Sequence, residues 1–152
     1  MENNKLFFNA VKRGDTKTVY SKYLSEDNID YNPKNIDGKT TLHIAAENGH
    51  KEIVKLFLNH PKVTDMNIRD KNGKTPMHLA AQEGHVEVLD LLLNHNMVYK
   101  NPMDNEGKTP MHVAAYEGHT NVIERLLAHD QGELQCSDMC RVFFVIRKYN
   151  FG

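Results

Sequence analysis

The sequence predicts an all-α solenoid, a row of stacked helix-turn-helix pairs, and two observations support this prediction. First, one pattern occurs three times, starting at Gly38, Gly73 and Gly107, in steps of 35 and then 34 residues. Second, the copy GKTPMHLAAQEGHVEVLDLLLNH, from Gly73 to His95, reads as two short helices separated by a glycine. Helices this short are marginally stable alone in water, so they must pack against neighbours. Such periods indicate a repeat architecture.

The middle copy shows why the chain should be helical at these positions. Thr75 can cap the free amides of the first helix, and Pro76 suits the first helical position because its fixed φ is already helical. Gly84 stands where a left-handed residue ends that helix. Small and apolar residues fill the first helix, and an i, i+3, i+4 stripe marks the second. These residues are Met77, Leu79, Ala80 and Ala81, then Val86, Val88, Leu89, Leu92 and Leu93.

A short motif recurs in register in the three copies. Its threonine, proline, histidine and alanine are Thr75, Pro76, His78 and Ala80, and again Thr109, Pro110, His112 and Ala114. The first copy has Thr40, His43 and Ala45, with Thr41 in place of proline. This pattern resembles the ankyrin-repeat family, whose units carry a T-P-L-H-x-A motif near a 33-residue period. The resemblance covers roughly residues 5–130, includes the glycines Gly49, Gly84 and Gly118, and implies helix pairs joined by β-hairpin loops.

Taken in order, the chain divides into a cap, three repeats and a tail. Residues 1–30 form a degenerate N-terminal capping repeat, which lacks the T-P-x-H motif and carries the charge that a terminal unit needs on its outer face. Its first helix is expected to contain Leu6, Phe7, Ala10 and Val11, and its second helix an apolar stripe of Val19, Tyr20, Tyr23 and Leu24. Three full repeats follow over residues 31–130, at about 31–65, 66–99 and 100–130. Residues 131–152 either fold back as an improvised cap or mark where further repeats diverge or stop.

The connections between helix pairs are expected to be hairpin fingers. Asp37-Gly38 and Asn72-Gly73 are strong hairpin dipeptides, and Glu106-Gly107 is a poorer one. In the ankyrin family these loops project roughly perpendicular to the helices, and the resemblance implies the same arrangement here. An asparagine lies six residues before each glycine, and we interpret it as a structural turn residue. The resemblance also allows hydroxylation at these positions, Asn32, Asn67 and Asn101.

Composition argues against several classes of function. The formal net charge is −1, so no broad basic field favours nucleic acid or an anionic membrane. No apolar run approaches the ~18 residues of a membrane span. The two cysteines, Cys136 and Cys140, both lie in the tail, so the repeats need no disulfide. This usage is typical of a reducing compartment, and we expect an intracellular monomer in the cytoplasm, or alternatively in the nucleus.

Nine histidines would ordinarily suggest metal or acid–base chemistry, but the repeat accounts for all of them. A catalytic or ligand histidine has no reason to be copied into each unit, so we interpret them as structural. A zinc site at Cys136 and Cys140 would need four convergent ligands, and the spacing does not supply them. We therefore expect no catalytic residue, cofactor or metal. The three histidine registers are His43, His78 and His112, then His50, His85 and His119, then His60, His95 and His129.

What remains for function is a surface. The resemblance implies a non-enzymatic scaffold that binds one or more partner proteins through its concave face, made of hairpin tips and first helices. Aromatic and long charged side chains make the better anchors, so Tyr116, beside a row of finger lysines, is the best single candidate. The plainer interpretation is that these positions are solvated and variable. Carried over by position, they are Ile36, Asp37, Lys39, Glu47, Asn48, Lys71, Asn72, Lys74, Gln82, Glu83, Asn105, Glu106, Lys108, Tyr116 and Glu117.

Two other functions stay open on the sequence alone. The chain is alternatively a regulatory or targeting fragment of a larger enzyme or channel, which the abrupt change of pattern in the tail suggests. An independent enzyme is the weakest option, because no nucleophile or acid–base set is left once the repeat is accounted for. The partner itself stays unidentified, since a fold does not fix a function.

Overall fold

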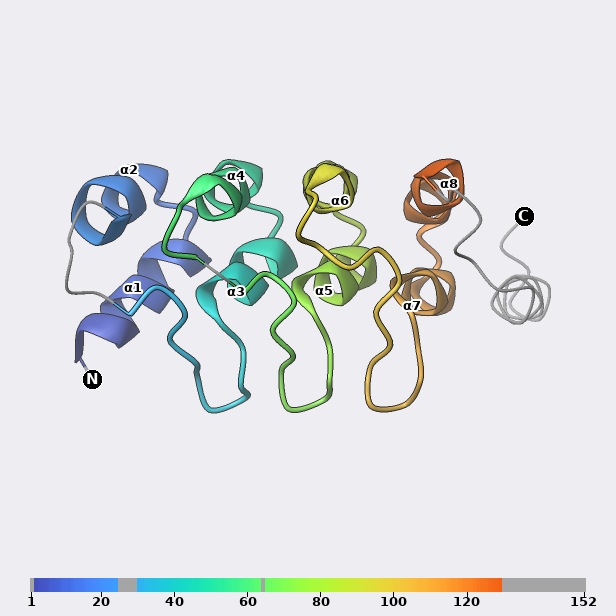
Figure 1. Ribbon diagram of the computed structural model, residues 1–152, viewed down its shortest axis with the longest axis horizontal. Coiled ribbons are helices and arrows are strands. Elements are labelled where there is room, and N and C mark those ends of the chain that lie inside the picture. The colour runs from blue at the N-terminus through green and yellow to red at the C-terminus, as the bar shows by residue number, and fades with distance from the viewer. Residues whose placement is uncertain (1, 25–29, 64, 130–152) are drawn as a thin grey trace.

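The computed structural model is a row of stacked helix pairs, and it describes residues 2–24, 30–63 and 65–129. Figure 1 shows two rows of helices, with α1, α3, α5 and α7 beside three projecting loops and with α4, α6 and α8 in the other row. Within the described ranges the chain contains no β-strand. The elements are α1 (Glu2–Lys12), α2 (Thr16–Thr18), the π-helix η1 (Val19–Leu24), α3 (Thr41–Glu47), α4 (Lys51–Asn59), α5 (Pro76–Glu83), α6 (Val86–Asn94), α7 (Pro110–Glu117) and α8 (Thr120–His129).

The main packing contacts run between neighbouring helix pairs. In the row beside the loops, α3 packs against α1 and α5, and α5 packs against α7. In the other row, α6 packs against α4 and α8. Each unit is thus stabilised by the unit beside it, which is the packing expected of a repeat protein. The predicted all-α solenoid is confirmed.

The first helices of the second and third repeats begin and end with the residues that the sequence indicated. Thr75 and Thr109 are N-caps in extended conformation, and Pro76 and Pro110 take the first helical positions. The histidine three residues after each threonine completes a capping box, because its ring accepts the threonine backbone N–H. At the other end Gly84 adopts φ 75° and donates its N–H to the Ala80 carbonyl. A residue with a Cβ rarely adopts this conformation, so glycine ends the helix cleanly.

The core is one continuous apolar layer along the row. The second helices supply its bulk, and the paired alanines of the first helices are fully buried, which lets neighbouring helices approach closely. Packing at the density of a protein interior makes such a layer sensitive to the loss of single methylene groups. The second-helix residues buried to 1% exposure or less in the three repeats are Ile53, Val54 and Phe57, then Val88, Leu89 and Leu92, then Val122.

The N-terminal unit departs from the expected pattern in two places. Phe7 stacks on Tyr23, with ring centroids 4.5 Å apart, but Leu6 is 46% exposed and Tyr20 is 62% exposed. Leu6 and Tyr20 therefore lie outside the buried face of this unit. The second helix of this unit continues as a π-helix, whose wider turns align Val19 with residues four and five positions later and leave Tyr20 on the outside.

Some expectations concern residues that the structure does not describe. The improvised cap or divergence of residues 131–152 lies outside the described residues, as do Cys136 and Cys140. In the part of the chain that is described, no helix has the length and apolar character to cross a membrane.

Candidate partner-binding surface

The three projecting loops are held in shape by a side chain at the start of each turn. In the middle loop, the Asp70 carboxylate accepts the backbone N–H groups of Asn72 and Lys74, both at 2.9 Å. Asp70 also exchanges backbone bonds with Lys74 and Gly73 across the turn. The same arrangement occurs in the first and third loops. The turn residues are Asn35, Asp70 and Asp104.

Sequence reasoning missed these three turn residues. It singled out the asparagines six positions before each glycine, whereas the loop is organised by the Asn or Asp three positions before it. A recurring Asn or Asp at this offset was the available signal, because such side chains bond their own backbone two residues on. The hairpin fingers are therefore built on side-chain-to-backbone bonds rather than on a ladder of paired strands.

The fingertips are also tied to one another. The Lys71 N–H donates to the Asp37 carbonyl at 2.9 Å, and the Asn105 N–H donates to the Asn72 carbonyl at 3.0 Å. The Asn105 side-chain amide adds a bond to the Lys71 carbonyl at 3.0 Å. These bonds link neighbouring fingers into one continuous edge, which Figure 1 shows as three loops side by side.

The first histidine register joins each first helix to the next finger. His43 Nδ1 accepts the Thr40 backbone N–H, and its Nε2–H donates to the Lys74 carbonyl at 3.0 Å. His78 repeats this arrangement one unit later, with the Lys108 carbonyl at 2.9 Å. Burial lowers the pKa of both imidazoles below the usual 6.5, because the charged form would lose its hydration. Neutral rings therefore hold the scaffold together.

The second histidine register bonds in the opposite direction along the row. The ring of His85 reaches the Glu47 carbonyl of the preceding unit at 3.0 Å, and His119 reaches the Gln82 carbonyl at 2.8 Å. His50 makes the same kind of bond to the Lys12 carbonyl at 3.0 Å. The histidines are strung out one per layer, and no group of metal-binding side chains occurs among the described residues.

The predicted binding positions all lie at the accessible surface of the fingers and first helices. Most are exposed, and Tyr116 keeps 65% of its surface open. Four are only half exposed, namely Lys39, Glu47, Lys74 and Gln82. The structure brings these four together in two pairs, each joining a finger to the first helix of the same unit.

The finger lysines occupy one register but have three different environments. Lys39 forms an ion pair with Glu47 at 2.7 Å, so its charge is balanced locally. Lys74 donates to the neutral Gln82 side chain. Lys108 pairs with Glu106 at 2.6 Å, and its ammonium lies 6.0 Å from the centre of the Tyr116 ring. The lysine row is therefore not a uniform basic stripe.

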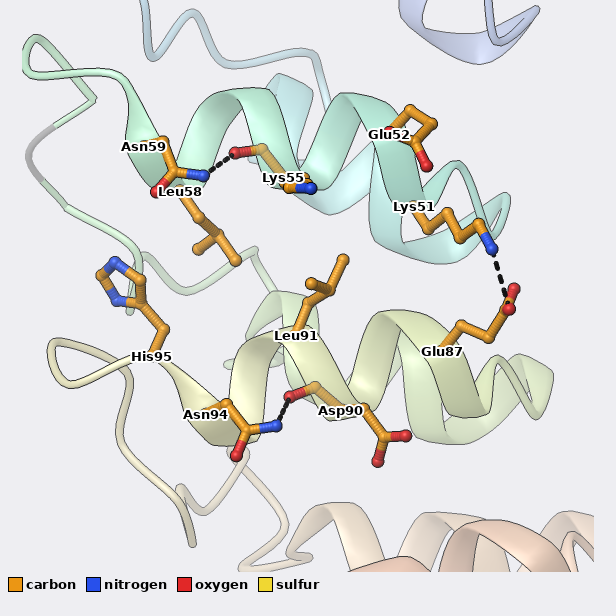
Figure 2. Close-up of a pocket in the computed structure, with 10 residues that line it drawn as sticks. All are labelled: Lys51, Glu52, Lys55, Leu58, Asn59, Glu87, Asp90, Leu91, Asn94 and His95. Atoms are coloured by element: carbon orange, nitrogen blue, oxygen red, sulfur yellow. Dashed lines mark hydrogen bonds and ion pairs between the residues drawn. The ribbon is translucent and has the colours of Figure 1, made fainter.

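Two of the hollows in the described part of the chain lie on opposite sides of the row. One lies between α4 and α6 and is lined by charges of both signs (Figure 2); Lys51 and Glu87 pair across it at 2.8 Å. At its other end the asparagines of the two helix ends bond carbonyls of their own helices, and Leu58 and Leu91 face each other. The other hollow lies between α1, the first finger and α3. It includes Lys5, Phe8, Lys12 and Lys34, which sequence reasoning did not select.

Comparison with known proteins agrees with this architecture. The family model described as ankyrin repeats (3 copies) matches residues 2–65 and 62–138. Among curated proteins, none matches the chain significantly. Ankyrin repeats are in general protein–protein interaction modules, and the family is typically non-enzymatic. The matched segments span most of the chain and coincide with the capped helix pairs and the fingers, so this chain belongs to the ankyrin-repeat family.

Proposed function

We propose that this protein is a non-enzymatic scaffold that binds a partner protein along its concave face. This proposal rests on the observation that, within each repeat, one set of residues forms the structural hydrogen bonds and another set is exposed. The threonine, histidine and turn residues form the hydrogen bonds of the fingers and helix ends, whereas the side chains at the positions between them point to solvent. Side chains held outward by an ordered backbone lose little further freedom on binding, which favours affinity.

Tyr116 is the anchor that this surface presents best. Its ring is 65% exposed at the end of α7, and the Lys108 ammonium lies over it. A large aromatic ring contributes much buried area for few rotatable bonds, which is why tyrosine is common among residues that dominate binding energy. We place Glu83, exposed on α5, and Lys74 beside it in the same contact surface.

A triple alanine substitution tests this assignment. Replacing Lys74, Glu83 and Tyr116 together should abolish capture of partner proteins from a cell extract, with the circular dichroism spectrum unchanged. A matched control replaces Tyr20, Lys55 and Glu124, which are the same residue types, exposed, and located on the second-helix side of the row. Equal loss in both variants, or undiminished capture by the first, would refute the assignment.

The same proposal includes the division of the chain and its setting. Residues 1–30 act as the N-terminal cap, and the repeats at about 31–65, 66–99 and 100–130 carry the binding face. We also propose that the protein is an intracellular monomer. Its concave face is then covered by the partner protein and not by a second copy of the chain.

A further inference from the structure

The hollow at the N-terminal end of the concave face differs from the rest of that face. It has a volume of about 600 Å³ and lies between α1, the first finger and α3. Its position places it at the edge of the capping unit, next to the predicted contact residues of the first repeat. The side chains that give it its character are Lys5, Phe8, Lys12, Lys34, Ile36 and Ile44. We refer to it as the cap groove.

The cap groove carries an excess of positive charge. Four lysines line it, against the two carboxylates Asp37 and Glu47. One of these lysines is already neutralised by its ion pair with Glu47. The other three, Lys5, Lys12 and Lys34, are exposed, and none of them forms an ion pair with a carboxylate in the described part of the chain. Three ammonium groups around one hollow attract a segment of negative charge.

The cap groove also exposes aliphatic side chains at two positions where the other repeats carry polar or buried residues. Ile36 is 85% exposed at the tip of the first finger, where the other two fingers carry Lys71 and Asn105. On the first helix, Ile44 is only half-buried, whereas Leu79 and its counterpart in α7 are buried at the same register. The groove therefore combines an open apolar floor with a basic rim.

The opposite end of the concave face is more acidic. Glu106 and Glu117 are exposed at the third repeat, and Lys108 is paired with Glu106. Complementary potentials steer a partner and fix its register on a surface. A bound segment would therefore have its acidic part at the cap and a less acidic part at the third repeat.

We infer that the cap groove binds an acidic segment of a partner protein, with one large aliphatic side chain seated between Ile36 and Ile44 and with carboxylates facing Lys5, Lys12 and Lys34. A protein segment fits better than a nucleic acid, because the groove contains carboxylates of its own and an aliphatic floor. This inference rests on the proposed function and specifies the chemistry of the partner.

A selection from random peptides of about a dozen residues, displayed on phage and bound to the full chain, tests the inference. The enriched peptides should combine Asp or Glu with Leu, Ile, Val or Phe. One enriched peptide is then labelled and titrated by fluorescence anisotropy. The variant Lys5→Glu, Lys12→Glu, Lys34→Glu should weaken its binding at least about tenfold, and added salt should weaken binding to the unaltered protein.

One control variant separates charge at the groove from charge in general, and a second variant tests the aliphatic contact. The variant Lys17→Glu, Lys22→Glu, Lys55→Glu makes the same change in net charge at exposed lysines of the second-helix side, and the affinity should stay within about twofold. Ile36→Ser removes the aliphatic fingertip from a side chain that is 85% exposed, so it should weaken binding without disturbing the fold.

Several outcomes would overturn the inference. The first is a selection that enriches no peptide, or only neutral or basic peptides. The second is a peptide affinity of the groove variant equal to that of the unaltered protein. The third is an affinity for a single-stranded oligonucleotide equal to that for the peptide. Peptides that are lost in the Lys74, Glu83, Tyr116 variant but kept in the groove variant would uphold the proposed function and reject the cap groove. Partner capture that is insensitive to both variants would instead reject the proposed function itself.

Discussion

Replacing Leu92 by alanine tests whether the second helices form the apolar layer that joins the repeats. Leu92 is fully buried in α6, which packs between α4 and α8. The substitution removes three carbon atoms, which at about 0.8 kcal/mol each amounts to about 2.4 kcal/mol of lost burial. If roughly 40 Å³ of the vacated space stays open, the cavity adds about 1 kcal/mol. We expect the free energy of unfolding to fall by about 3 to 4 kcal/mol.

Urea denaturation followed by circular dichroism measures this loss. With a slope of about 2 kcal/mol per molar urea, the midpoint should fall by about 1.5 to 2 M. Leu91 provides a matched control on the same helix, because it is only half-buried and faces the hollow between α4 and α6 (Figure 2). Leu91→Ala should cost about 1 kcal/mol, since much of its side chain is already in water. A Leu92→Ala loss below about 0.5 kcal/mol, or no larger than that of Leu91→Ala, would contradict burial between layers.

Three further predictions concern the histidines, the glycines and the surface ion pairs. Burial lowers the pKa of His43 and His78, so these side chains bind protons at higher pH in the unfolded chain than in the folded one. The free energy of unfolding should therefore fall as the pH drops below about 6.5. The urea midpoint of a His43→Gln, His78→Gln variant should depend less on pH. Gly84→Ala should lower the free energy of unfolding, measured by urea denaturation, by about 1 kcal/mol more than Gly107→Ala, because of steric overlap. Both residues have positive φ, but of the two only at Gly84 would the new methyl lie 2.7 Å from a histidine ring. Glu87→Ala should leave the urea midpoint unchanged, because its ion pair with α4 is open to solvent; a clear shift would show that this pair stabilises the repeat seam.

Local signals explain why the fold could be predicted from the sequence. Thr75, Pro76 and Gly84 each fix one end of a helix through a property of that single residue. The period then places copies of the same ends along the chain, and burial of the leucine stripe follows because short helices must pack together. None of these steps needs a contact between distant parts of the chain to be known in advance.

The cap groove could not be predicted in this way. Ile44 and Leu79 occupy the same position in the repeat, yet the first is half-buried and the second is buried. Their exposure depends on which unit lies beside them, and the pattern of one repeat does not contain that information. Tyr20 illustrates the same limit, because its exposure follows from a local π-helix that the apolar spacing alone does not reveal.

The finger lysines share one position in the repeat but have different neighbours in each unit. One lysine recurs in all three units, and a repeated residue cannot by itself distinguish one partner from another. What differs is the residue it meets, which is glutamate at 47, glutamine at 82 and tyrosine at 116. The lysine charge is thus balanced by a carboxylate in the first repeat and stays unbalanced beside a neutral amide in the second. In the third repeat the lysine is paired with Glu106 and also lies near an aromatic ring. In the proposed function a partner would be recognised by this change along the row. Exchanging residues between equivalent positions should then alter specificity while leaving the scaffold intact.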